Sequence, residues 1–203
     1  MDNFTYGRYL AAKKSIDDRA LNHHVWQTLG RSLGQIRKGE PMKVLEIGAG
    51  IGTMLVRAVE RGLLAGPSTY VATDCDAERF RAARTYISQW ARQQGHSLSW
   101  SGALAGRLRT DDADVSVVFD PISAETLADQ PDKHTFCHLL IAHAVLDLID
   151  FPSLLPKLLP KLKDGKISAL RTKEIRNSRE WKQAGRWLSF WWFLIRLMNT
   201  LEK

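Results

Sequence analysis

The fold of this chain is decided by the stretch Lys43-Val44-Leu45-Glu46-Ile47-Gly48-Ala49-Gly50-Ile51-Gly52. Its first part is short, apolar and ended by glycine, which predicts a buried parallel strand over residues 42–47. The glycines that follow predict a tight turn into a helix, with backbone amides directed at a crevice that no side chain fills. A strand, a glycine turn and a helix in this order are typical of folds that bind nucleotides.

Two acidic residues flank this predicted crevice. Glu46 lies two positions before Gly48, and Asp74 lies 28 residues after Glu46, at the end of a second predicted strand over residues 69–73. Because the carboxyl ends of parallel strands meet at one edge of a sheet, we expect both carboxylates beside the crevice. Their charge suits a cationic, ribose-bearing ligand.

The rest of the chain alternates between helical and strand patterns. Apolar residues at helical spacing predict helices that start at Ser15, near Met54, after a cap at Asp76, and near Leu154, the last of them interrupted by Pro156 and Pro160. This alternation predicts an α/β fold with a doubly wound, mainly parallel sheet. Further strands are predicted at residues 98–101, 115–119, 138–142 and 167–171, with a loop over 102–113 and Gly165 introducing the last strand.

Length and composition narrow the class of protein. With 203 residues and 44% hydrophobic content, the chain can bury one substantial core. Its two cysteines, Cys75 and Cys137, have no paired spacing, so we expect neither a disulfide framework nor a metal site. The first ten residues lack the apolar core of a secretory signal, and no apolar run reaches the length of a membrane span. We therefore expect a cytoplasmic protein.

The net charge of +7 is concentrated near the C-terminus. Residues 166–203 hold 9 Lys/Arg and 3 Glu, which leaves 20 basic and 19 acidic residues in the remainder. Any nucleic-acid surface would thus depend on this terminal part. Its apolar run Leu188–Met198 and four of the seven tryptophans favour an apolar partner instead, either a second copy of the chain or a membrane surface contacted peripherally. We expect no nucleic-acid partner.

The glycine spacing discriminates between cofactors. A dinucleotide fingerprint needs a glycine at its sixth position, where this chain has Thr53, and this disfavours a dehydrogenase. Glycines at 48, 50 and 52 with an acid two places earlier resemble instead the first motif of class I S-adenosylmethionine-dependent methyltransferases. The resemblance continues in residues 139–149, like the family's fourth strand and following helix, and in residues 158–170, like its fifth segment. It covers about residues 42–171.

This resemblance implies S-adenosylmethionine as cofactor and suggests roles for individual residues. The family's glycines admit the methionine portion, its acid after the second strand binds the ribose hydroxyls, and the residue after the third strand contacts adenine. These roles fall on the glycine turn, on Asp74 and on Asp120. His143 is a candidate base, although the family has no obligatory catalytic residue. The implied cofactor-binding residues are Glu46, Gly48, Ala49, Gly50, Gly52, Asp74, Cys75, Asp120 and Ala142.

The chain departs from the family after its fifth strand. Family members add two further strands there, one of them antiparallel, whereas this sequence turns basic and rich in tryptophan. We expect a Rossmann-like methyltransferase core that lacks the last two strands and carries N- and C-terminal helices. The expected units are residues 1–41 as a helical lid or cap, 42–171 as the cofactor-binding domain and 172–203 as a basic helix. Packing of the first helix on the sheet is an equally good interpretation.

Two functional classes follow. The first is methyl transfer to a small-molecule acceptor, because residues 141–144 lack the Pro-Pro-aromatic motif of nucleic-acid amino methyltransferases and neither cysteine follows a proline. The second is a catalytically incomplete binding or interaction protein that associates through its C-terminal hydrophobic helix.

Overall fold

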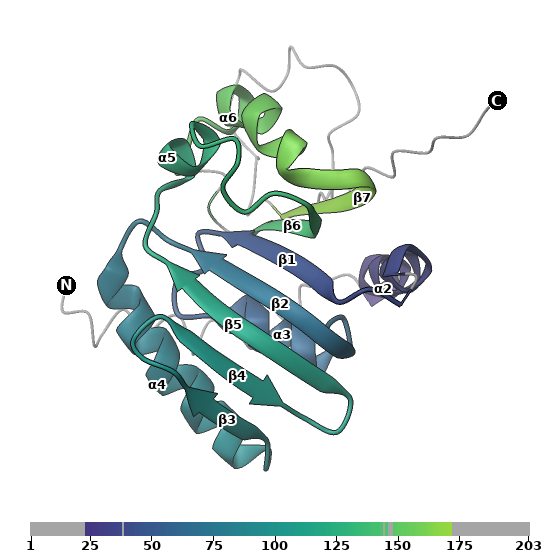
Figure 1. Ribbon diagram of the computed structural model, residues 1–203, viewed down its shortest axis with the longest axis vertical. Coiled ribbons are helices and arrows are strands. Elements are labelled where there is room, and N and C mark those ends of the chain that lie inside the picture. Colours follow the sequence, from purple (N-terminus) through teal and green to yellow (C-terminus); the bar gives the residue numbers. More distant parts are fainter. Residues whose placement is uncertain (1–22, 38, 144, 146–147, 172–203) are drawn as a thin grey trace.

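A seven-stranded sheet organises the molecule, with the strand order β3-β4-β5-β2-β1-β6-β7 (Figure 1). The computed structural model describes residues 23–37, 39–143, 145 and 148–171. The strands are β1 (Met42–Ile47), β2 (Gly66–Thr73), β3 (Ser97–Trp100), β4 (Ala105–Arg109), β5 (Ala113–Asp120), β6 (Cys137–His143) and β7 (Leu162–Arg171). The helices are α2 (His23–Arg37), α3 (Thr53–Glu60), α4 (Ala77–Gln93), α5 (Ala124–Ala128), α6 (Phe151–Leu158) and the 3-10 helix η1 (Leu159–Lys161).

The five strands from β5 to β7 run parallel, in the order β5-β2-β1-β6-β7. β1 lies in the middle of these five strands because four of its six side chains are apolar and can be buried on both faces of the sheet. The predicted α/β fold with a mainly parallel sheet is therefore confirmed. The C-terminal helix predicted over 172–203 lies outside the described residues.

Helices cover both faces of the sheet. α3 and α4 lie behind the sheet in Figure 1, and their apolar side chains share one core cluster with Trp26, Leu29 and Leu33 of α2. α5 and α6 belong to a second cluster on the other face, beside β6 and β7. The described part of the predicted lid, α2, thus packs against the core. Residues 1–22, which would form the rest of that lid, lie outside the described part of the chain.

The predicted loop over residues 102–113 is wrong, because this segment contains β4. β4 pairs antiparallel with both β3 and β5, so a hairpin extends the sheet beyond β5. The indole of Trp100 fixes the hairpin, because it stacks on Phe119 with 5.6 Å between ring centroids. Phe119 stacks in turn on Phe80 of α4, and the Arg84 guanidinium lies 5.0 Å from the Trp100 ring centroid. Aromatic packing, rather than strand propensity, holds the hairpin on the core.

The segment before the last strand agrees with the prediction from the sequence, except for the residue at which the strand starts. A helix broken near its prolines was predicted, and α6 indeed gives way to η1 at Leu159, one residue before Pro160. The strand was expected to start after Gly165, but β7 starts at Leu162. The register with β6 shifts between Cys137 and Leu139, so the residues around Gly165 form an irregularity inside the strand instead of a turn before it.

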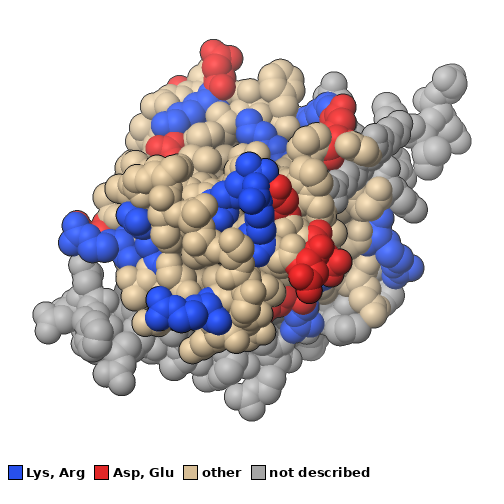
Figure 2. All heavy atoms as spheres, turned by 60° about the horizontal axis from the view of Figure 1, so that its bottom comes forward, with Lys and Arg blue, Asp and Glu red and all other residues tan. Residues whose placement is uncertain are grey.

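The charged side chains show no continuous basic face in the view of Figure 2, where Lys and Arg alternate with acidic and uncharged groups among the described residues. None of the helices in that part of the chain combines the length and the apolar character that a bilayer span demands.

The contact between Trp100 and Gly106 generates a test of the hairpin. An added Cβ at Gly106 would lie 2.8 Å from Trp100 Cζ3 and 2.9 Å from the Ser99 carbonyl oxygen. Gly106→Ala is expected to destabilise the protein by about 1–3 kcal/mol, measured by urea unfolding, because the added methyl pushes on an indole that is held by Phe119 and by a hydrogen bond to Ser88. As a control, Gly34→Ala in α2 adds a methyl where no atom lies within 4 Å. It is expected to raise stability by about 0.5–1 kcal/mol.

Candidate functional site

The residues predicted to form the site meet at the carboxyl edge of the sheet. Ile47 at the end of β1 is level with Thr73 of β2 and with Ala142 of β6. Thr73 is in turn level with Asp120, the last residue of β5. The glycine turn, Asp74, Asp120 and the end of β6 therefore lie along one edge, as expected of a doubly wound sheet.

The turn after β1 needs its glycines for backbone geometry and for packing. Gly48, Gly50 and Gly52 all have left-handed conformations, with φ of 70°, 56° and 77°. A Cβ at Gly48 would lie 2.7 Å from the Val145 side chain, and one at Gly52 would lie 2.9 Å from Ile87 Cδ1. Two of the three glycines thus make room for side chains of the protein itself.

Three amides of this turn are bonded within the protein, so the prediction of amides directed at an open crevice is wrong for Ala49, Gly50 and Gly52. The Ala49 amide donates to the Thr73 carbonyl at 2.9 Å, and the Gly52 amide donates to the Ala49 carbonyl at 2.9 Å. The Gly50 amide donates to the Asp74 carboxylate at 2.8 Å. The turn is therefore tied to the end of β2 by its own hydrogen bonds.

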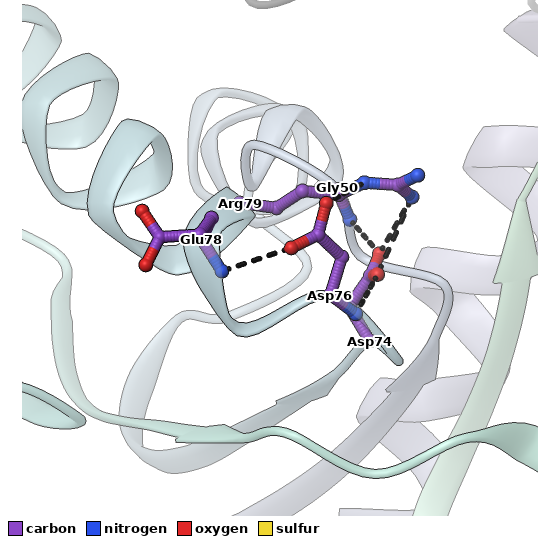
Figure 3. Close-up of polar contacts among 5 residues, drawn as sticks. All are labelled: Gly50, Asp74, Asp76, Glu78 and Arg79. Atoms are coloured by element: carbon purple, nitrogen blue, oxygen red, sulfur yellow. Dashed lines mark hydrogen bonds and ion pairs between the residues drawn. The ribbon is translucent and has the colours of Figure 1, made fainter. Parts of the chain in front are cut away.

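Asp74 is bonded to both the glycine turn and the start of α4 (Figure 3). One carboxylate oxygen, Oδ2, accepts from the Gly50 amide, and Oδ1 accepts from the Asp76 amide at 3.0 Å. Arg79, in the first turn of α4, places Nη1 at 3.3 Å from Oδ1 and 3.4 Å from Oδ2. The Asp74 side chain is 1% exposed and that of Arg79 is 34% exposed. The guanidinium thus covers a carboxylate whose other hydrogen-bond partners are backbone amides.

Asp120, the predicted adenine-side residue, is also paired with side chains of the protein, one lysine and one histidine. Its Oδ2 lies 2.6 Å from His134 Nε2 and 2.8 Å from Lys133 Nζ. Burial opposes ionisation, but the hydrogen bonds and charges of Lys133 and His134 outweigh it and hold the pKa of Asp120 below its ordinary value. His134 has a φ of 53°, which is uncommon for a residue other than glycine.

The loop that carries Lys133 and His134 is fixed by a buried lysine. Lys161 Nζ donates to the carbonyl oxygens of Gln130 at 2.6 Å and Lys133 at 2.8 Å. The Lys161 side chain is fully buried, and this burial lowers the pKa of its amine. Because the ammonium is bound by the backbone of the loop, the position of Lys133 opposite Asp120 is set by η1.

Glu46 lies in the core beneath the turn rather than open to the crevice. It is 2% exposed, and its carboxylate accepts a 2.7 Å hydrogen bond from the Tyr70 hydroxyl. Burial raises the pKa of Glu46 to about 7, although the Tyr70 hydrogen bond and the charge of Arg57 oppose the rise. Glu46 is therefore a buried residue of the core. Its contact with a cofactor stays a prediction.

The remaining predicted residues differ in accessibility. Cys75 is exposed directly after Asp74, whereas Ala49 and Ala142 are buried. His143 is the last residue of β6, and its side chain lies outside what the structure describes. Within the described residues, no three acidic, histidine or cysteine side chains are grouped as metal ligands would be.

Several residues of this edge were missed from the sequence. Arg79 stands three residues after the helix cap Asp76, a spacing that brings side chains together at the start of a helix and could have identified the pair. Arg57 lies among the apolar residues of α3, which indicates a buried charge. No local pattern identifies Tyr70 or Val145, because their contacts join separate elements.

The buried Glu46 makes stability depend on pH. Between pH 4.5, its ordinary pKa, and about 7, folded Glu46 holds a proton that the unfolded chain has lost. Its contribution to the free energy of unfolding therefore falls as pH rises through this window and stays low above it. Glu46→Gln keeps an acceptor for Tyr70 without the charge, so it is expected to gain roughly 2–3 kcal/mol relative to wild type between pH 5 and pH 8. Urea unfolding at both values measures this gain.

Glu125→Gln, at an exposed position in α5, serves as the control and is expected to leave the pH profile unchanged. A Glu46→Gln profile parallel to that of wild type would show that Glu46 does not titrate in this window.

Comparison with known proteins identifies solved structures that are similar in fold. No family model and no curated protein matches the sequence. An S-adenosylmethionine-dependent methyltransferase from Clostridium acetobutylicum ATCC 824 matches with a TM-score of 0.50 and 11% identity, over 84% of this chain and 58% of that one. The plantazolicin methyltransferase BpumL, solved with a triazolic desmethylPZN analog and SAH, matches with a TM-score of 0.45 and 15% identity, over 81% of this chain and 52% of that one.

The chain spans about half the length of these solved structures. At such low identity the likeness concerns the fold alone. The sequence resemblance is thus confirmed at that level: the described residues form a methyltransferase-like Rossmann fold with an added β-hairpin.

Proposed function

We propose that this protein binds S-adenosylmethionine at the carboxyl edge of β1 and β2 and transfers its methyl group to a small-molecule acceptor. The observation that carries the proposal is the position of Asp74. In a methyltransferase-like fold it directly follows β2 and accepts a hydrogen bond from the Gly50 amide of the glycine turn. A carboxylate fixed next to such a turn suits the hydroxyls of a ribose.

The residues at this edge fit such a nucleoside in their chemistry. Asp74 offers a carboxylate whose orientation is already set by two backbone amides. Asp120 is a second acceptor on the neighbouring strand, for the exocyclic amine of adenine. Gly50, which has a left-handed conformation, keeps the centre of the turn free of a β-carbon, as an approaching methionine portion would require.

Bound S-adenosylmethionine supplies an activated methyl group, so the chain itself needs to align an acceptor and exclude water. The end of β6 is the natural place for the acceptor, because it adjoins β1 on the side away from β2. His143 ends this strand and is the candidate to take a proton from the acceptor. The small-molecule class of the acceptor rests on the sequence, as does our expectation that nucleic acid is not a partner.

A binding protein without turnover is the second candidate, and one observation favours it. The carboxylates of Asp74 and Asp120 are both paired with cations of the same chain, Arg79 and Lys133. A protein that retained the fold for association, through the apolar segment Leu188–Met198 with another copy or a membrane surface, could keep such pairs permanently.

Isothermal titration with S-adenosylmethionine and S-adenosylhomocysteine tests the proposal. Wild type is expected to bind both, and Asp74→Asn is expected to weaken binding about 10- to 100-fold, because charged hydrogen bonds to the ribose are lost. Asp111→Asn changes an exposed acid in the turn between β4 and β5, and is expected to bind like wild type.

The outcomes separate the candidates. Binding accompanied by methyl transfer in a screen of small nucleophiles supports the enzyme, and binding without transfer supports the second candidate. Absence of binding by folded wild type would refute both the cofactor and the site.

A further inference from the structure

We propose that Arg79 is a latch over Asp74, which competes with the ribose hydroxyls of a nucleoside and so sets the affinity and selectivity of the site. This inference rests on the proposed function, because it concerns the same carboxylate. It adds a residue that the resemblance does not assign and a specific event, the displacement of one guanidinium, that binding requires.

The geometry of Asp74 leaves little room for a ligand while Arg79 is in place. Each carboxylate oxygen accepts one backbone amide, from Gly50 or from Asp76, and each also lies within 3.4 Å of Arg79 Nη1. A vicinal diol needs to donate one hydrogen bond to each oxygen, and the remaining acceptor positions are those that the guanidinium covers. The Asp74 side chain is 1% exposed and Arg79 lies against both of its oxygens, so in our proposal a ligand reaches Asp74 when Arg79 moves.

Arg79 has a second carboxylate within reach. Its Nε lies 3.3 Å from Oδ2 of Asp76, whose side chain is 38% exposed. Oδ1 of Asp76 is already used as the cap of α4, accepting the Glu78 amide at 3.0 Å. Figure 3 shows the Arg79 side chain beside Asp76 with its guanidinium at Asp74. The guanidinium can therefore leave Asp74 and keep an ionic partner, which makes the exchange with a ligand reversible.

Two consequences follow for binding. A nucleoside with both ribose hydroxyls replaces the contacts between Arg79 and Asp74, so its affinity is reduced by the cost of breaking them. A nucleoside without these hydroxyls has nothing to offer Asp74 and gains nothing from the removal of Arg79. The latch therefore acts only on ligands that carry the diol.

The experiment compares adenosine with 2′,3′-dideoxyadenosine by isothermal titration of wild type, Arg79→Met and Arg81→Met. Methionine keeps the apolar stem of arginine without its donors. Adenosine is expected to bind Arg79→Met about fivefold more tightly than wild type, as expected when a partly exposed ion pair no longer competes. The affinities of 2′,3′-dideoxyadenosine for wild type and for Arg79→Met are expected to differ by less than twofold. Arg81 lies in the same helix, is 81% exposed and pairs with Glu78, so Arg81→Met is the matched control and should resemble wild type.

A second variant is expected to change the affinity for adenosine in the opposite direction. Asp76→Asn keeps a residue that caps helices well but removes the charge to which Arg79 retreats, so adenosine is expected to bind it more weakly. Unchanged or weaker adenosine binding by folded Arg79→Met, or equal gains for both nucleosides, would overturn the latch. If Arg79→Met does not fold, Asp76→Asn decides alone, and unchanged or tighter binding overturns the latch.

Failure of the proposed function looks different from failure of the latch. If wild type binds S-adenosylhomocysteine and adenosine but Arg79→Met changes nothing, only the latch is refuted. If no variant binds either compound, the cofactor site is refuted and the latch with it.

Discussion

The carboxylate of Asp74 joins the parts of the molecule on which the site depends. It accepts the Gly50 amide from the turn after β1 and the Asp76 amide from the start of α4. These two amides belong to the elements that follow two neighbouring strands, so one side chain sets both their separation and their orientation. Its charge is balanced within the chain by Arg79, since a carboxylate this deeply buried is stable only when it is bonded and paired.

The same side chains at the carboxyl edge of the sheet stabilise the fold and, in our proposal, take part in binding. Val145 packs against Gly48, Arg79 covers Asp74, and Lys133 and His134 hold Asp120. The groups that a nucleoside would contact therefore already have partners in the protein. Binding at such an edge is an exchange of internal contacts for ligand contacts, which makes selectivity depend on whether the ligand reproduces the hydrogen bonds that it displaces.

The sequence predicted the elements whose cause is local. The buried run of β1, the apolar stripe of α4 and its cap at Asp76 follow from patterns within a few residues, and the structure confirms them. β4 was missed because Leu108 is its only fully buried residue between two arginines, and its stability comes from pairing and from the Trp100 indole. The contacts between Tyr70 and Glu46, and the internal bonds of the turn amides, join separate elements, so no local pattern predicts them. The convergence of the site at one edge was predictable because it follows from parallel topology.

The hairpin also determines how the sheet ends. β3, its outermost strand on that side, is only four residues long, and Ser97 and Ser99 alternate on it with side chains that face α4. A strand this short, with small hydroxyl side chains toward water, presents few unpaired backbone groups in a row to a neighbouring molecule. The hairpin thus closes this margin of the sheet against edge-to-edge association, and on this side it keeps β5, the outermost parallel strand, away from intermolecular pairing.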